Sequence, residues 1–350
     1  VMRMLGWLTA KKDAALAGLQ QLLRSLPTPP FRDWFGSYGV VVHLYNSHFS
    51  FSFQPNITAT ISAANDVDLG APGAAVTLDS TRLSALASFS TARNFLITAN
   101  GGAINTNGFN LTLSGNLTAN GTLVKEGPGT LVLTGNNVWH AVPLILSGQI
   151  EGNSDSLQTS LSLDDGVTVR FNQVEDGSYS GVMAQNYGYY ANRPQFEKTG
   201  AGKLTLTASQ SYGGATNLLQ GTLALQGAGS LGNTSGVNVA AGAVLDISGA
   251  TTTDQNVGAL SGSGSVVLGT NRAVIDSGYD STFSGRISGA GSVLKMGYQT
   301  LTLTSTQDYA GGTTIGEGRL ALSGQGRLSA TGSLHLFGGS FDIANSPFNH

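Results

Sequence analysis

The chain has no cysteine and few charged residues, and both absences exclude classes of protein. Without cysteine, its 350 residues can form no disulfides, cysteine zinc sites or thiol nucleophiles. A cysteine-free chain also suits export through an oxidising periplasm, where premature disulfides would trap an unfolded polypeptide. Only 11% of the residues are charged, against roughly 25% in ordinary globular domains. Serine, threonine and asparagine must therefore supply most of the polar surface.

Long apolar runs and a surplus of positive charge are also missing. No stretch of about 18 apolar residues occurs, so we expect no transmembrane helix. The formal net charge of −3 offers no basic field for phosphate groups, so we expect no nucleic-acid partner. The first residues contain no apolar signal-peptide core, which suggests an excerpt or a mature piece of a longer protein.

One pattern occurs three times, at residues 125–150, 198–223 and 295–320. Each copy has a lysine, a glycine, two alternating leucines, a large aromatic residue, an aliphatic residue and a second glycine. The copies are Lys125, Gly127, Leu131, Leu133, Trp139, Ile145 and Gly148; Lys198, Gly200, Leu204, Leu206, Tyr212, Leu218 and Gly221; and Lys295, Gly297, Leu301, Leu303, Tyr309, Ile315 and Gly318. Such self-similarity is typical of stacked coils.

From about Asn56 onward, short alternating runs bounded by glycine and asparagine follow one another. Every second side chain is Leu, Val or Ile, and those between are mostly Thr, Ser or Asn, which predicts short strands with one buried face. If one turn of the coil, here called a rung, takes about 20–25 residues, the chain forms on the order of a dozen rungs in an elongated rod. Glycine, at 49 residues, is predicted to form the corners with positive φ.

Residues 1–55 have a different pattern from the rest of the chain. Leucines at three- and four-residue intervals predict an amphipathic helix at about 8–26, which the prolines from Pro27 onward end. Alternating apolar residues on either side of Asn46-Ser47 predict a hairpin at about 40–53. The region is either a cap on the stack or a segment unrelated to it.

The repeat resembles the autotransporter-associated β-strand repeat of passenger domains in bacterial type V secretion. The residues that carry this resemblance are Lys-x-Gly-x-Gly-x-Leu-x-Leu-Thr, an aromatic, Gly-Gly-x-Thr-x-Ile and Gly-x-Leu-x-Leu. The copy at Lys198 fits nearly throughout, and the copy at Lys295 has Gln299 in place of a glycine. In the first copy Trp139-His140-Ala141 and Pro143 replace the aromatic-Gly-Gly-x-Thr segment, so we expect a distorted rung there.

The resemblance implies an all-β fold, a right-handed parallel β-helix over 56–350, with the helix and hairpin region at 1–55. It implies a secreted or cell-surface, outer membrane-associated virulence protein of a Gram-negative bacterium that is not an enzyme and uses no cofactor. Its expected role is adhesion or cell–cell aggregation. The expected partners are a host-cell surface protein or glycan, or a second copy, and a translocator β-barrel in the parent protein.

Two alternatives to an adhesive scaffold remain open. In the first alternative, the rod is the stalk of an autotransporter enzyme whose catalytic domain lies outside this chain. In the second, the rod is itself a β-helical polysaccharide-active enzyme. The second alternative needs converging acids, for which Asp164-Asp165 and Glu175-Asp176 are candidates for acid–base catalysis or calcium binding. Both pairs precede a glycine, and turns are the favoured interpretation. The histidines are scattered, and no metal site is predicted.

Phenylalanine and tyrosine are concentrated between residues 171 and 196. Tyrosine offers a flat apolar face and a hydroxyl group, which suits contact with sugars or proteins. We therefore predict a ligand-contact loop with Tyr179, Tyr187, Tyr189 and Tyr190. The alternative is that these tyrosines fold back on the flank of the coil.

Overall fold

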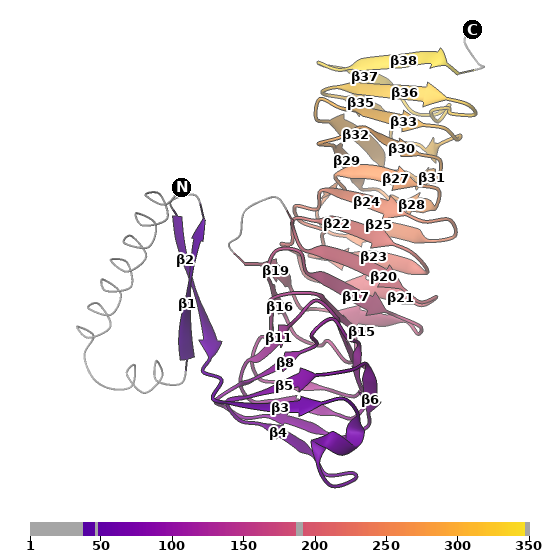
Figure 1. The fold of residues 1–350 in the computed structure, drawn as a ribbon. Helices are drawn as coiled ribbons and strands as arrows, with labels where there is room; N and C mark the ends of the chain where they lie inside the picture. Colours follow the sequence, from indigo (N-terminus) through magenta and orange to yellow (C-terminus); the bar gives the residue numbers. More distant parts are fainter. Residues whose placement is uncertain (1–37, 46–47, 187–191, 347–350) are drawn as a thin grey trace.

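The computed structural model describes residues 38–45, 48–186 and 192–346, and from Ala59 onward they form a coil of short strands. The coil has about 13 turns and is elongated (Figure 1). All strand pairs within it are parallel among the described residues. The predicted all-β, parallel β-helical fold is confirmed. The helix predicted at about 8–26 lies outside the described residues.

One sheet runs along the whole coil and is called the long sheet. Its thirteen strands are β6 (Phe89–Thr91), β9 (Leu111–Leu113), β12 (Thr130–Leu133), β15 (Gln149–Gly152), β17 (Thr168–Asn172), β20 (Gln195–Thr199), β22 (Ala215–Leu218), β24 (Gly236–Val239), β27 (Ala259–Gly262), β30 (Ser281–Phe283), β33 (Thr300–Leu303), β36 (Arg319–Ser323) and β38 (Ser340–Asn345).

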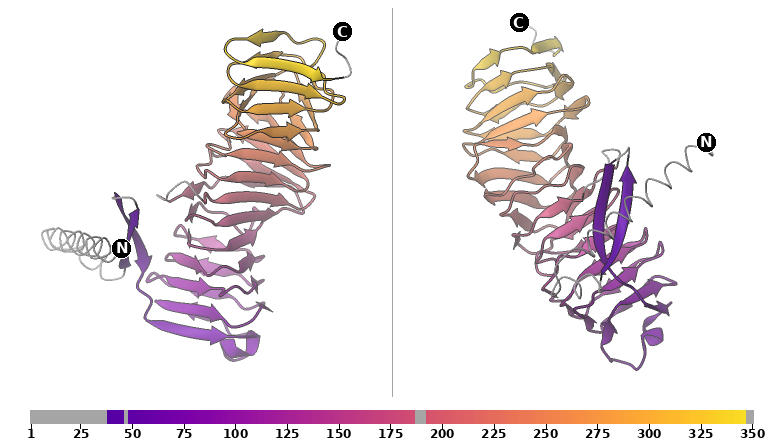
Figure 2. Two further views of the ribbon diagram at one scale, coloured as in Figure 1. Left: turned by 45° about the horizontal axis from the view of Figure 1, so that its top comes forward. Right: turned by 90° about the vertical axis from the view of Figure 1, so that its left-hand side faces the viewer.

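Shorter sheets form the other two sides of the coil (Figure 2). The side that precedes the long sheet in the N-terminal turns consists of β3 (Ala59–Ala63), β5 (Thr81–Ala85), β8 (Gly102–Asn105), β11 (Leu123–Glu126), β14 (Leu144–Ile145), β16 (Leu161–Leu163) and β19 (Met183–Gln185). In the C-terminal turns its counterpart consists of β26 (Asp254–Asn256), β29 (Arg272–Asp276), β32 (Ser292–Met296), β35 (Thr313–Ile315) and β37 (Leu334–Leu336).

The side that follows the long sheet is likewise divided in two. Its N-terminal strands are β4 (Val76–Leu78), β7 (Phe95–Ile97), β10 (Leu117–Ala119) and β13 (Val138–Trp139). Its C-terminal strands are β18 (Gly177–Tyr179), β21 (Lys203–Leu206), β23 (Thr222–Gly227), β25 (Val244–Ala250), β28 (Ser265–Val267), β31 (Arg286–Gly289) and β34 (Asp308–Tyr309).

A pair of strands precedes the coil, and a short helix lies between β3 and β4. Strands β1 (Tyr38–Tyr45) and β2 (His48–Pro55) pair antiparallel as a separate sheet. The 3₁₀ helix η1 (Asp66–Leu69) packs its Leu69 against the core. The buried Arg93 fixes this turn, because its guanidinium donates to the Asp66 carboxylate at 2.9 Å and to the carbonyl of Gly70 at 3.0 Å. Whether residues 1–55 act as a cap stays a prediction.

The apolar residues of successive rungs lie above one another. In the side sheet that follows the long sheet, Leu204 pairs with Leu223, Leu223 with Leu245 and Leu245 with Val266. All four are buried. Because each rung covers the apolar face of the one before it, the core is a continuous column, as the alternation predicts.

Some of the scarce charged residues connect rungs on the outer faces. Arg170 on β17 lies between Glu151 on β15, at 3.3 Å, and Glu197 on β20, at 2.7 Å. Arg82 on β5 reaches Glu126 on β11 at 2.9 Å. These pairs are partly exposed, so each contributes no more than about 1 kcal/mol. They help to set register, while burial of the apolar column supplies most of the stability.

The repeat glycines form corners, as predicted. Gly221 and Gly318 have φ of 70° and 65°, a region that residues with a Cβ adopt only at a cost. A Cβ at Gly318 would lie 2.3 Å from the carbonyl oxygen of Gly297, the corner glycine of the preceding rung. The corner therefore requires glycine both for its backbone angle and for the close approach of two rungs.

Gly318→Val is expected to destabilise the coil by more than about 3 kcal/mol, because strain at positive φ adds to a backbone clash. Thr302→Val, on the outward side of β33, should change the unfolding free energy by no more than about 0.5 kcal/mol. Urea unfolding followed by circular dichroism measures both. Equal midpoints for the two variants would contradict the assignment of Gly318 to a constrained corner.

Candidate functional site

Tyr179, predicted as part of a ligand-contact loop, is a core residue. Its side chain is 1% exposed, and its hydroxyl donates to the carbonyl of Thr159 at 2.7 Å. Burial raises the pKa of this tyrosine. Tyr179 therefore has no surface to offer to a ligand, while Tyr187, Tyr189 and Tyr190 lie outside the described residues.

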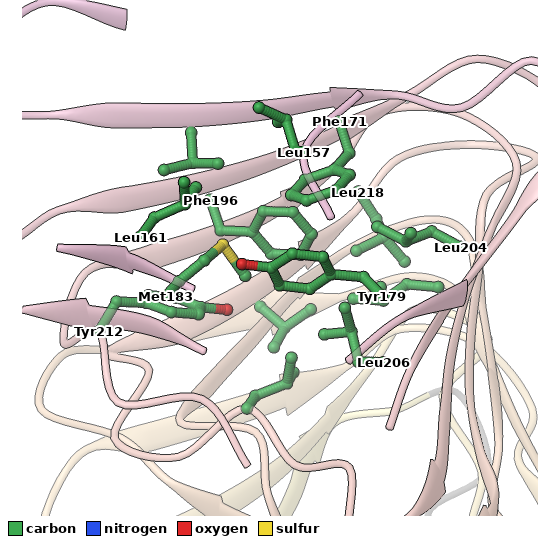
Figure 3. Packing of buried hydrophobic residues seen from close by; sticks show 14 of the residues in the cluster. Leu157, Leu161, Phe171, Tyr179, Met183, Phe196, Leu204, Leu206, Tyr212 and Leu218 are labelled. Carbon is green, nitrogen blue, oxygen red and sulfur yellow. The ribbon is translucent and has the colours of Figure 1, made fainter. Parts of the chain in front are cut away.

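The aromatic residues around Tyr179 form a ladder inside the coil (Figure 3). Ring centroids lie 4.9 Å apart between Phe171 and Tyr179, 5.9 Å between Phe171 and Phe196, and 5.9 Å between Phe196 and Tyr212. All three contacts are edge-on, the geometry that aromatic quadrupoles favour. Part of the aromatic concentration in the sequence therefore fills the core.

The two acid pairs lie at corners. Asp164 accepts from the amide of Asn186 at 2.9 Å, and Asp165 from that of Gln185 at 3.1 Å. Asp176 accepts from the backbone N–H of Lys203 at 2.8 Å. These bonds tie neighbouring rungs together, which fits the turn interpretation. Within residues 38–45, 48–186 and 192–346, no group of three potential metal ligands comes together.

The lysine that opens each repeat points into the coil. Lys125, Lys198 and Lys295 are fully buried, although each carries an ammonium group. Each lysine lies two residues after an inward-facing apolar residue of the same strand, namely Leu123, Phe196 or Val293. Strand alternation thus directs the lysine stem inward, where the pattern otherwise places an aliphatic side chain.

The ammonium groups bind the carbonyls of the corner. Nζ of Lys198 donates to the carbonyls of Thr199 at 2.8 Å, Gly200 at 2.7 Å and, on the next rung, Gln220 at 3.1 Å. Nζ of Lys125 makes the equivalent bonds, to Glu126, Gly127 and Ser147. A tight corner leaves carbonyls without strand partners, and a charged donor satisfies several of them at once.

The third lysine binds its own corner. Nζ of Lys295 donates to the carbonyls of Met296 at 2.6 Å and Gly297 at 2.8 Å. Ile315 of the next rung pairs with Lys295 in register, as Leu218 does with Lys198. The aliphatic residue of the repeat therefore stacks on the lysine stem. The lysine and the aliphatic residue are both recurring positions of the repeat. They thus contact each other between neighbouring rungs.

The aromatic residue of the repeat is also fixed by a polar contact. The hydroxyls of Tyr212 and Thr216 lie 2.6 Å apart, and those of Tyr309 and Thr313 lie 2.5 Å apart, all of them buried. The first copy has Pro143 at the threonine position, and the indole N–H of Trp139 donates to the carbonyl of Ser156 instead, at 3.1 Å.

The same repeat occupies two different corners of the coil. Lys125 and Lys295 lie at the corner that leads into the long sheet, between β11 and β12 and between β32 and β33. Lys198 lies at the corner that leaves it, between β20 and β21. The repeat is therefore a local unit of strand, corner and strand that is not tied to one face.

A groove runs along the corner that leads into the long sheet. It has a volume of about 770 Å³ and crosses the starts of β20, β22, β24, β27 and β30. Its lining residues come from five successive rungs and are mostly polar: Asn192, Arg193, Gln195, Gly214, Ala215, Asn233, Thr234, Ser235, Asn256, Asp276, Gly278 and Tyr279. The sequence pattern does not reveal this site, because these residues gather only through the register of the coil.

Comparison with known proteins identifies the repeat. The model of the passenger-associated-transport-repeat matches residues 123–139, 196–225 and 293–322, the segments that carry the buried lysines. This chain carries the repeats of autotransporter passenger domains. The resemblance predicted from the sequence is thereby confirmed. No solved structure matches the chain.

A curated relative extends the comparison. The Adhesin BmaC autotransporter of Brucella suis biovar 1 (strain 1330) is 37% identical over 147 residues. The match covers 39% of this chain and 4% of that protein, so the chain spans a small part of the relative's length. In the described part of the chain, no helix is long and apolar enough to cross a membrane.

Lys198→Met is expected to lower the free energy of unfolding by about 1–3 kcal/mol, because buried corner carbonyls lose their donor. Lys203→Met is the matched control, since Lys203 is half exposed and only 3.8 Å from Asp176 in a surface pair. That variant should change stability by less than about 1 kcal/mol. Urea titration of both variants tests the comparison, and a larger loss for Lys203→Met would refute the role of the buried ammonium.

Stability should also rise with pH above neutrality. Burial lowers the pKa of Lys125 and Lys198 to about 8, from an ordinary value of 10.5. Between these values the unfolded chain binds protons that the folded chain has released, so the free energy of unfolding increases with pH. Tyrosine ionisation acts in the opposite direction near pH 10, because burial raises the pKa of Tyr309 to about 12 while an unfolded tyrosine titrates near 10, so the comparison stays at or below about pH 9.5.

The test compares the intact chain with Lys198→Met at pH 7.5 and pH 9.5. The unfolding free energy of the intact chain should rise more than that of the variant, which has lost one of the titrating lysines. Equal increments for the two proteins would show that Lys198 does not titrate in this range.

Proposed function

We propose that this chain is a non-catalytic scaffold in the passenger of a secreted or surface-displayed Gram-negative autotransporter, and that it serves in adhesion or cell–cell aggregation. The observation that carries the proposal is the combination of three passenger repeats with similarity to a protein named an adhesin. A stacked coil suits this role, because its core is self-contained and its corners are free to carry contact residues.

The contacts that Asp164, Asp165 and Asp176 make support a binding role over an enzymatic one. Glycoside cleavage requires two carboxylates that flank one bond. Asp164 and Asp165 hold the amides of Asn186 and Gln185, and Asp176 holds a corner N–H and the ammonium of Lys203. These carboxylates are thus occupied in joining rungs. Binding to a host-cell protein or glycan, or to a second copy, is the activity that we propose.

The proposal is tested with the 350-residue chain coupled to fluorescent beads. We expect saturable attachment to epithelial cells, competed by the free chain, or concentration-dependent aggregation of the beads. Beads coated with an unrelated β-helical protein of similar length provide the control. If coated beads neither attach nor aggregate beyond that control, the adhesive role is refuted.

Tyr187, Tyr189 and Tyr190 are proposed as ligand contacts within this role. A triple alanine variant should keep its urea midpoint and lose at least about tenfold in attachment, since aromatic contacts dominate binding energy at interfaces. Phe337→Ala is the matched control, because Phe337 is 81% exposed and belongs to a distant rung. Unchanged attachment of the triple variant would remove these tyrosines from the contact surface.

A further inference from the structure

The groove along the corner that leads into the long sheet has the length and direction of an extended ligand. Its lining residues precede β20, β22, β24, β27 and β30, which are consecutive strands of the long sheet. Adjacent strands lie about 4.8 Å apart, so the groove extends about 19 Å parallel to the coil axis. That is the reach of a short oligomer laid along the rod.

The wall of the groove presents several side-chain amide groups. Among the described residues, the exposed side-chain amides of Asn192 and Asn233 make no hydrogen bond. Asn256 is held by the carbonyl of Gly232 at 3.4 Å and by the N–H of Gly258 at 2.9 Å. An amide offers a donor and an acceptor side by side, which matches two adjacent hydroxyl groups of a sugar.

Tyr279 supplies a flat surface in the groove. It is 51% exposed, and its hydroxyl oxygen would lie 2.6 Å from a Cβ at Gly236. The tyrosine thus reaches back over a glycine of an earlier rung, where any larger residue would displace it. An exposed ring in this position offers an apolar face to the C–H side of a sugar ring and a hydroxyl at its edge.

Other classes of extended ligand fit the groove less well. A peptide that adds a strand needs a free sheet edge, but β20, β22 and β24 are each paired on both sides. Nucleic acid needs a basic surface, and the charged lining residues are one arginine, Arg193, and one aspartate, Asp276. The balance of these charges favours a neutral ligand.

We infer that this groove binds a neutral, hydroxyl-rich oligosaccharide along the coil axis, stacked on Tyr279 and hydrogen-bonded by Asn192 and Asn233. The inference rests on the proposed adhesive function and names the class of ligand for it. Binding takes place without cleavage, because Asp276 is the one carboxylate among the residues that line the groove.

The test measures binding of the 350-residue chain to neutral tetrasaccharides of glucose, mannose, galactose and N-acetylglucosamine, on an array and then by calorimetry. At least one neutral tetrasaccharide should bind at least about tenfold more tightly than its disaccharide, because the groove spans five rungs. The acidic comparison is tetragalacturonate, which should bind more weakly. Failure of every neutral probe, or stronger binding of tetragalacturonate, would overturn the inference.

Variants locate the site. Tyr279→Ala and Asn233→Ala should each weaken binding at least about tenfold with unchanged urea midpoints. Phe109→Ala, an exposed aromatic in the N-terminal turns, should bind as the intact chain does. Equal binding by Tyr279→Ala and the intact chain would place the ligand elsewhere, and release of shorter sugars would contradict binding without cleavage.

The same variants separate this inference from the proposed function. Loss of sugar binding with bead attachment retained leaves adhesion standing and overturns the groove as its contact site. Sugar binding without attachment or aggregation overturns adhesion and leaves the groove as a carbohydrate site. Loss of both in Tyr279→Ala, with Phe109→Ala unaffected, supports the two together.

Discussion

Three corners of the coil depend on the contact between a buried ammonium group and the carbonyls of the turn, and the rungs that stack on them depend on those corners. A chain that turns sharply within a few residues exposes carbonyls to the core, where an unpaired one costs about 1–3 kcal/mol. Lys125 and Lys198 each satisfy three such groups and join two rungs through the third. Burying a charge is itself costly, so the position is stable only because the bonds converge on one nitrogen.

Much of the fold was predictable from the sequence, because strand alternation and glycine corners are local properties. Leu301 and Leu303 alternate with Thr302, and this period alone placed the leucines inside. Gly221 and Gly318 stood where the chain must turn, and their φ values are positive. The period of the repeat indicated a stacked coil, since a single rung cannot cover its own apolar face.

Other features could not be predicted, because they depend on how rungs align. Tyr179 is buried edge-on against Phe171, and that partner lies on a different strand. The recurrence of lysine was the available signal for the corner contact, but a charged residue is ordinarily expected on the surface of a protein. The groove gathers Asn192, Asn233 and Tyr279 from separate rungs, so it becomes visible only once the number of residues in each turn is known.

The placement of the second repeat at another corner has an evolutionary implication. The lysine unit at Lys198 lies at the corner leaving the long sheet, while those at Lys125 and Lys295 lie at the corner entering it. The unit is therefore not restricted to one side of the coil. Duplicated units can therefore be inserted with spacers of unequal length and still stack. Lengthening or shortening a spacer would rotate the side chains on the neighbouring loops to another side of the coil axis, without changing the packing of the core.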